Sequence, residues 1–195
     1  MPIRVIAGAA KGRRLKMVPG DTTRPVMDRV KEALFNILGR GIVGSSFLDL
    51  FAGTGSVGIE ALSRGAGRVV FIDRHPLAIR TIHENLERTR LADRAEVLRA
   101  DSLVYLRHPR PEAFEYVYVA PPQYKGVWKE VLLALDENRA HLQPEGVVIV
   151  QIDPHEREEV SLRALRPYDE RVYGKTMLWF FEHDADEESA PNRSG

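Results

Sequence analysis

Apolar residues along the chain fall into short continuous runs, and stretches with helical spacing separate these runs. Strands that helices cover on both faces are apolar nearly throughout, whereas half-exposed strands alternate apolar and polar positions. This rhythm of strand and helix predicts an α/β fold with a doubly wound, mainly parallel sheet. The expected strands are FLDLF (47–51), RVVFID (68–73), RAEVLRA (94–100), EYVYVA (115–120) and GVVIVQI (146–152).

Two segments depart from this rhythm. Near the N-terminus, IRVIAGAAKGRRLKMV (3–18) predicts two short strands around a turn, and TRPVMDRVKEALFNIL (23–38) predicts a helix opened by Thr23 and Pro25. Near the C-terminus, YDERVYGKTMLWFFE (168–182) predicts a hairpin. We therefore expect a small N-terminal extension, made of a β-hairpin and a helix, and an antiparallel C-terminal edge strand in the sheet.

Length and composition limit the number of domains. A chain of 195 residues, 44% of them hydrophobic, can bury one sizeable core. We expect a basic N-terminal extension over residues 1–40 and a main domain over residues 41–182. Residues 183–195 are rich in acidic residues and have hardly any apolar side chain, so they predict a disordered acidic tail.

Several classes of chemistry and location are disfavoured. The chain has no cysteine, which excludes disulfides, thiolate metal sites and cysteine nucleophiles. The histidines have no recognisable ligand spacing, so we expect no metal. No apolar run reaches 18 residues and no apolar signal segment begins the chain, so we expect a cytoplasmic protein with no membrane partner. We also expect a monomer.

The charge is balanced overall but unevenly distributed. Lys and Arg together number 28, as do Asp and Glu, yet residues 1–40 hold nine basic residues against three acidic ones. A basic stretch is most often a solvated face, and clustered guanidinium and ammonium groups also bind nucleic-acid phosphates. The candidates for phosphate binding are Arg13, Arg14, Lys16, Arg24, Arg29 and Lys125.

Candidate ligand contacts gather at the ends of the expected strands, where doubly wound sheets bind their ligands. The first strand runs into the glycine turn of FLDLFAGTGSVGIEAL (47–62), which satisfies the spacing G-x-G-x-x-G and has Asp49 just ahead of it. The second strand ends in Asp73, and Asp101 follows the third. The fourth strand ends in the run APPQY (120–124).

The position of Asp49 distinguishes between two cofactors. A nicotinamide dinucleotide would bring a doubly negative pyrophosphate to the glycine turn, and the carboxylate would repel it. S-adenosylmethionine has a positive ammonium and a positive sulfonium instead. The chain also has no room for the substrate domain of many dehydrogenases. The sequence therefore favours S-adenosylmethionine, although the glycine spacing alone also fits a turn that binds nothing.

The chain resembles the RsmD family of bacterial 16S ribosomal RNA guanine-N2 methyltransferases. The most specific matches are RVIAGAAKGRRL (4–15) with TRPVMDRVKEALFNIL, and YGKTMLWFF (173–181) is a further one. The resemblance implies a class I S-adenosylmethionine-dependent methyltransferase fold, Rossmann-like, over the main domain. It also implies methylation of the exocyclic N2 amine of a guanine in 16S ribosomal RNA, guanine 966 in the family, within an assembled small ribosomal subunit.

The resemblance also implies roles for the strand-end residues. Asp49, Phe51, Gly53 and Gly55 would contact the methionine part of the cofactor, Asp73 its ribose, and Asp101 with Ser102 its adenine end.

The fourth strand end departs from the family pattern. Many amino-methylating relatives have Asn or Asp, then Pro-Pro, then Phe or Tyr, whereas this chain has Ala120, Pro121, Pro122, Gln123 and Tyr124. The remaining acceptors for a substrate amine are the carbonyls of Ala120 and Pro121 or the amide of Gln123, and Tyr124 can stack on a base. Two alternatives stay open: methylation of another amine, such as a protein glutamine or another RNA base, and a noncatalytic RNA-binding relative.

Overall fold

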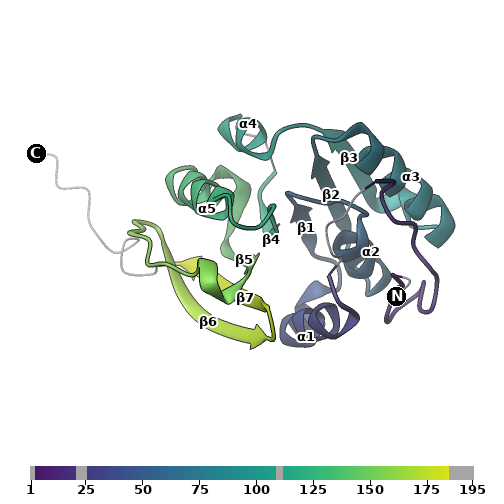
Figure 1. Ribbon diagram of the computed structural model, residues 1–195, viewed down its shortest axis with the longest axis horizontal. Helices are drawn as coiled ribbons and strands as arrows, with labels where there is room; N and C mark the ends of the chain where they lie inside the picture. The colour runs from purple at the N-terminus through teal and green to yellow at the C-terminus, as the bar shows by residue number, and fades with distance from the viewer. Residues whose placement is uncertain (1–2, 21–25, 109–111, 185–195) are drawn as a thin grey trace, which may run out of the picture.

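The computed structural model describes residues 3–20, 26–108 and 112–184 (Figure 1). Arg24 and the expected helix-opening residues Thr23 and Pro25 lie outside these residues, as does most of the predicted acidic tail.

The centre of the molecule is a seven-stranded sheet with the order β3-β2-β1-β4-β5-β7-β6. The first five strands pair in parallel, and β7 pairs antiparallel with both β5 and β6. This topology confirms the predicted doubly wound sheet with an antiparallel C-terminal edge. The strands are β1 (Ser46–Asp49), β2 (Arg68–Asp73), β3 (Ala95–Arg99), β4 (Phe114–Val119), β5 (Leu142–Ile152), β6 (Leu165–Tyr173) and β7 (Thr176–His183).

Helices cover both faces of the sheet (Figure 1). The α-helices are α1 (Asp28–Leu38), α2 (Ser56–Ser63), α3 (Pro76–Thr89), α4 (Ser102–Arg107) and α5 (Val127–Glu137). Four short 3₁₀ turns join elements: η1 (Gly39–Ile42), η2 (Ala92–Arg94), η3 (Arg139–His141) and η4 (Pro154–Glu156). α1 begins at Asp28, later than the sequence pattern predicts.

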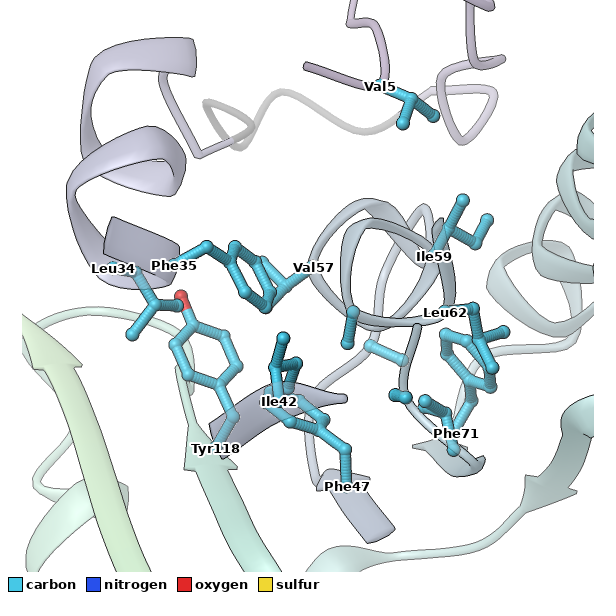
Figure 2. Close-up of a cluster of buried hydrophobic side chains, with 14 of the residues drawn as sticks. Val5, Leu34, Phe35, Ile42, Phe47, Val57, Ile59, Leu62, Phe71 and Tyr118 are labelled. Carbon is cyan, nitrogen blue, oxygen red and sulfur yellow. The ribbon is translucent and has the colours of Figure 1, made fainter. Parts of the chain in front are cut away.

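The core consists of two clusters, one on each face. Successive strand residues point to opposite faces, so Phe47 of β1 packs with α1, α2 and α3 in a first cluster, whereas Leu48 packs with α4 and α5 in a second. Figure 2 shows the first cluster, in which Tyr118 of β4 and Leu34 and Phe35 of α1 lie close together.

The N-terminal segment pairs with itself less extensively than predicted. Its antiparallel pairing is a single bridge between Arg4 and Arg14. Hydrogen bonds flank this bridge, from the Leu15 N–H to the Ile3 carbonyl at 2.8 Å, from the Val5 N–H to the Arg13 carbonyl at 3.0 Å and from the Gly12 N–H to the Val5 carbonyl at 2.8 Å. The turn of this segment packs directly on α2. A Cβ added at Gly8 would lie 1.8 Å from a main-chain oxygen of α2. Because the segment packs on a helix, it does not extend the sheet.

A buried ion pair attaches this segment to α2. The Glu60 carboxylate accepts hydrogen bonds from the N–H groups of Ile6 at 2.9 Å and Ala7 at 3.0 Å. Lys31 of α1 lies 3.5 Å from that carboxylate and donates to the Arg4 carbonyl at 2.6 Å. Both charged side chains are fully buried, and burial lowers the pKa of Lys31. The extension is therefore joined to the helix that follows the glycine turn.

Candidate active site

The glycine turn links β1 to α2 immediately after Asp49. Gly53 and Gly55 have φ values of 53° and 77°, in the left-handed region that glycine adopts without a steric penalty. Gly58, in the first turn of α2, has another role: a Cβ there would lie 2.3 Å from the ring of Phe71 in β2. The first two glycines thus allow the sharp turn, and the third allows the helix to approach the sheet closely.

Side chains from neighbouring elements hold this turn in place. The Gly53 N–H donates to Asp73 Oδ2 at 2.9 Å, and the His75 N–H donates to the other oxygen of that carboxylate at 2.9 Å. Asn85 of α3 donates to the Thr54 carbonyl at 2.9 Å. Asp73, predicted as a ribose ligand, therefore also positions the turn, and its oxygens retain lone pairs for further hydrogen bonds.

The Asp49 carboxyl group is buried and incompletely hydrogen-bonded. The residue is 1% exposed, and its Oδ1 has no hydrogen-bond partner among the described residues. The pKa of Asp49 is raised to about 7, mainly by burial and also by the charge of Asp73, against the opposing effect of the N–H groups of Phe51 and Gly58. A buried carboxylate without a counter-charge is costly, so this position is suited to a positively charged group of a ligand.

The third strand end contains residues with clear structural roles. Asp101 caps α4, accepting hydrogen bonds through Oδ1 from Leu103 N–H at 3.0 Å and Val104 N–H at 3.1 Å. The buried Ser102 hydroxyl donates to the Leu50 carbonyl. Such a cap stabilises the start of a helix and explains this Asp without a ligand. The predicted contact of both residues with an adenine stays a prediction.

The fourth strand end forms an exposed turn. Ala120 directly follows β4 and is half-buried, and Pro121 is buried, whereas Pro122, Gln123 and Lys125 are exposed. The two prolines restrict the backbone here.

Tyr124 protrudes from this turn with 66% of its surface exposed. Its φ of 58° is unusual for a residue that is not glycine. Its N–H donates to Glu156 Oε1 at 2.7 Å. The hydrogen bond between its hydroxyl and Asp153 raises the pKa of Tyr124. The backbone and the hydroxyl are thus anchored, while the ring stays accessible.

Asp153 and Glu156 are functional candidates that sequence reasoning missed. Both follow β5, the fifth parallel strand, in η4 and its cap. Hydrogen bonds from the His155 N–H and then the Tyr124 hydroxyl lower the pKa of Asp153 to about 2. The available signal was the run QIDPHE (151–156), which places two carboxylates after a strand as the other strand ends do.

The predicted phosphate-binding residues differ in their surroundings. Arg13 donates to the Arg88 carbonyl near the end of α3, and Lys16 forms an ion pair with Glu84 of α3 at 2.6 Å. The side chains of Arg14 and Arg29 are exposed, as is that of Lys125 beside Tyr124. Residues 13–16 therefore line one flank of α3, whereas Lys125 lies at the fourth strand end.

The part of the chain that the structure describes offers neither a metal site nor a membrane-spanning helix. Within it, no cluster of three or more His, Asp or Glu side chains is arranged to hold a metal ion. None of the helices in the described ranges is long and apolar enough to cross a membrane.

Comparison with known proteins gives consistent matches. The family model "Conserved hypothetical protein 95" matches residues 3–182. The ribosomal RNA small subunit methyltransferase D of Haemophilus influenzae is 36% identical over 153 residues, which are 77% of this chain and 79% of that protein. The solved structure of yhhF from Escherichia coli is 30% identical and superimposes with a TM-score of 0.83, covering 95% of this chain and 99% of that one.

A more distant structure has the same fold. It is an RNA methyltransferase from Salinibacter ruber in complex with S-adenosyl-L-homocysteine, 18% identical, with a TM-score of 0.62 over 82% of this chain and 93% of that one. The likeness agrees with a class I methyltransferase fold, as the sequence predicts.

Proposed function

Since the chain belongs to the RsmD family, we propose that it is an S-adenosylmethionine-dependent methyltransferase that acts on 16S ribosomal RNA. Its target in this proposal is the exocyclic N2 amine of a guanine, guanine 966 by family resemblance, in the assembled small ribosomal subunit. The observation that carries the proposal is the buried Asp49 carboxyl group beside the glycine turn, one oxygen of which has no hydrogen-bond partner among the described residues.

The residues of the turn fit this cofactor. The buried Asp49 carboxylate has a negative charge, and the positive methionine end of the cofactor would supply its counter-charge. Apart from its two chain neighbours, no described residue has an atom within 4 Å of a Cβ placed at Gly53, so the turn is open on that side. Asp73 retains acceptor lone pairs for ribose hydroxyls, and Phe51 is half-buried beside the turn. When bound, the cofactor supplies an electrophilic methyl group on sulfur.

The basic residues and Tyr124 suit an RNA substrate. Guanidinium and ammonium groups on the flank of α3 would contact phosphates, and Lys125 would do so beside the turn at residues 120–124. The exposed Tyr124 ring would stack on the target base once that base is turned out of its helix. The contacts of Tyr124 with Asp153 and Glu156 would hold the ring ready for this stacking.

The reaction requires orientation more than a strong base. The N2 lone pair is delocalised into the guanine ring, so the amine is a poor nucleophile. When the nitrogen takes the methyl carbon, the carbon–sulfur bond breaks with its electron pair on sulfur, and the nitrogen loses one proton to water. Holding the amine in line contributes up to roughly 7 to 11 kcal/mol in favourable systems. The main-chain carbonyls of Ala120 and Pro121 are available to orient the amine.

A single-turnover assay tests this function. Small subunits and naked 16S RNA from cells that lack the protein are incubated with excess protein and labelled S-adenosylmethionine, and the methylated nucleotide is mapped by mass spectrometry. We expect one methyl group on N2 of one guanine. Cofactor binding without transfer to any RNA would favour a noncatalytic RNA-binding protein. A methylated protein glutamine would favour an enzyme that acts on another amine.

Tyr124→Ala is the diagnostic variant. It should lower transfer by about 10- to 150-fold through the loss of stacking, with cofactor affinity unchanged. Tyr168→Ala is the matched control, because Tyr168 is also exposed but lies on the edge strand β6. Equal effects of the two substitutions would contradict the stacking role.

A further inference from the structure

The strand register places Gln151 beside the unusual Ala120. β4 and β5 are parallel neighbours, with Tyr118 opposite Ile149 and Val119 opposite Val150. One more step along both strands brings Ala120, directly after β4, opposite Gln151 near the end of β5. The two residues thus occupy adjacent positions at the edge of the sheet where the turn at residues 120–124 begins.

Both residues also lie on the same face of the sheet. Side chains alternate along a strand, so Ala120 shares the face of Tyr118, and Gln151 shares the face of Ile149. Tyr118, Ile149 and Ala120 all belong to or pack against the first core cluster, whereas Val119 and Val150 belong to the second. Figure 2 shows the Tyr118 side chain on this face, directed towards α1.

Asp49 belongs to the same arrangement. It lies opposite Tyr118 in the register of β1 and β4, and two positions after Phe47 of the first cluster. Its charge is also among the causes that raise the pKa of Tyr118, after burial. The face that contains Ala120 and Gln151 is therefore the face of the carboxyl group that we assign to the cofactor.

Tyr118 holds the Gln151 side chain. The Tyr118 residue is 1% exposed, and its hydroxyl donates a hydrogen bond to Gln151 Oε1 at 2.5 Å. Gln151 is half-buried, so the residue is partly accessible at this end of β5. An amide oxygen has two lone pairs, and the tyrosine uses one of them. Gln123, the other amide near the turn, is exposed.

We propose that Gln151 is a catalytic residue whose amide oxygen accepts an N–H of the substrate amine, because Ala120 provides no side-chain acceptor. This role rests on the proposed methyltransferase function. The hydrogen bond strengthens as the amine nitrogen becomes positively charged, so it stabilises the transition state more than the bound substrate. The amide orients the amine and takes no proton, which passes to water.

Gln151→Leu tests the role, because leucine has a similar size and no acceptor. We expect the single-turnover rate on small subunits to fall by about 10- to 100-fold, with cofactor affinity by calorimetry within about twofold of the parent. Gln143→Leu is the matched control: Gln143 lies near the other end of β5, where it donates to the Ala113 carbonyl at 3.3 Å. Its rate should equal that of the parent.

A rescue experiment separates an acceptor from a packing role. Adding Ala120→Asn to the Gln151→Leu variant supplies an amide from the neighbouring strand and should recover at least tenfold of the lost rate. Loss of Gln151 packing would not be repaired in this way. Tyr118→Phe gives a second measurement if Gln151→Leu does not fold: it removes only the orienting hydroxyl and should lower the rate about 3- to 10-fold.

The outcomes distinguish this inference from the proposed function. An active parent with an unaffected Gln151→Leu variant overturns the role of Gln151 and leaves the function standing. A loss that Ala120→Asn does not rescue also overturns it. A parent that transfers no methyl group to any ribosomal RNA substrate overturns the function, and the role of Gln151 with it.

Discussion

Asp49 combines two properties at the scale of a single residue: its carboxyl group is buried, and one of its oxygens has no partner among the described residues. Its pKa is raised to about 7, so the folded protein keeps this proton over a range in which the unfolded chain has lost it. Without ligand, its contribution therefore lowers stability as the pH rises from about 4 to about 7, by at most about 1.4 kcal/mol per pH unit.

Cofactor binding should show the opposite trend with pH. A positively charged ligand favours the ionised carboxylate, so affinity for S-adenosylmethionine should rise as the pH increases from 5.5 towards 7.5, by at most about tenfold per unit. Calorimetry across this range measures the slope. Asp49→Asn should weaken binding and flatten the slope, whereas Asp169→Asn on β6 should change neither. An unchanged slope in Asp49→Asn would contradict the assigned contact.

At the scale of the elements, the buried pair of Lys31 and Glu60 joins three parts of the fold. Lys31 belongs to α1 and Glu60 to α2, and both bind main-chain groups of the N-terminal segment. The Lys31 ammonium also donates to Ser56 at 3.1 Å, at the start of α2. The segment that contains the predicted phosphate-binding residues is thus attached to the helix that begins at the glycine turn.

Removing one partner of this pair should destabilise the protein strongly. Glu60→Ala leaves the buried Lys31 ammonium without its counter-charge and the part-buried N–H groups of Ile6 and Ala7 without their acceptor. This should cost about 3 to 5 kcal/mol in the free energy of unfolding. Urea denaturation measures this cost. Glu84→Ala is the control, because its ion pairs with Lys16 and Arg80 lie at the surface, where such pairs add little to stability. A cost of less than 1 kcal/mol for Glu60→Ala would refute this interpretation.

At the scale of the whole molecule, the net charge is balanced, but the basic residues of different surfaces have different surroundings. The N-terminal segment brings Arg13, Arg14 and Lys16 along α3, and two of these already have partners within the protein. On the opposite edge of the sheet, the basic residues near and on β6 pair with acidic neighbours: Arg157 with Glu170, Arg166 with Glu182 and Arg171 with Asp169. Of these two surfaces, the first is expected to bind RNA.

Salt dependence tests this distribution. The combined change of Arg13, Arg14 and Lys16 to Ala should flatten the slope of RNA affinity against salt by one to about three phosphate contacts, the lower value applying if Arg13 and Lys16 keep their internal partners. The combined change of Arg157, Arg166 and Arg171 to Ala should leave the slope unchanged. Fluorescence anisotropy with a small-subunit RNA fragment measures both. A larger effect at the β6 edge would place the RNA surface there.

The spacing of apolar residues and glycines within short stretches of the sequence accounts for the parts of the fold that could be predicted. The apolar runs predicted the five parallel strands, and the run at 168–182 predicted the antiparallel edge, because burial on both faces leaves a pattern in the sequence. Glycine spacing likewise predicted the turn, since only glycine adopts its left-handed conformations readily. The start of α1 was less predictable, because helix ends depend on caps and tertiary contacts.

The sequence by itself thus determined the order of the elements, the glycine turn and the aspartates at the strand ends, since each depends on residues close together in the chain. The tertiary structure alone decided which distant groups meet. It placed Gln151 beside Ala120, joined Tyr124 to Asp153 and Glu156, and paired Lys31 with Glu60. These contacts depend on strand register and helix packing, and no local pattern of residues encodes either.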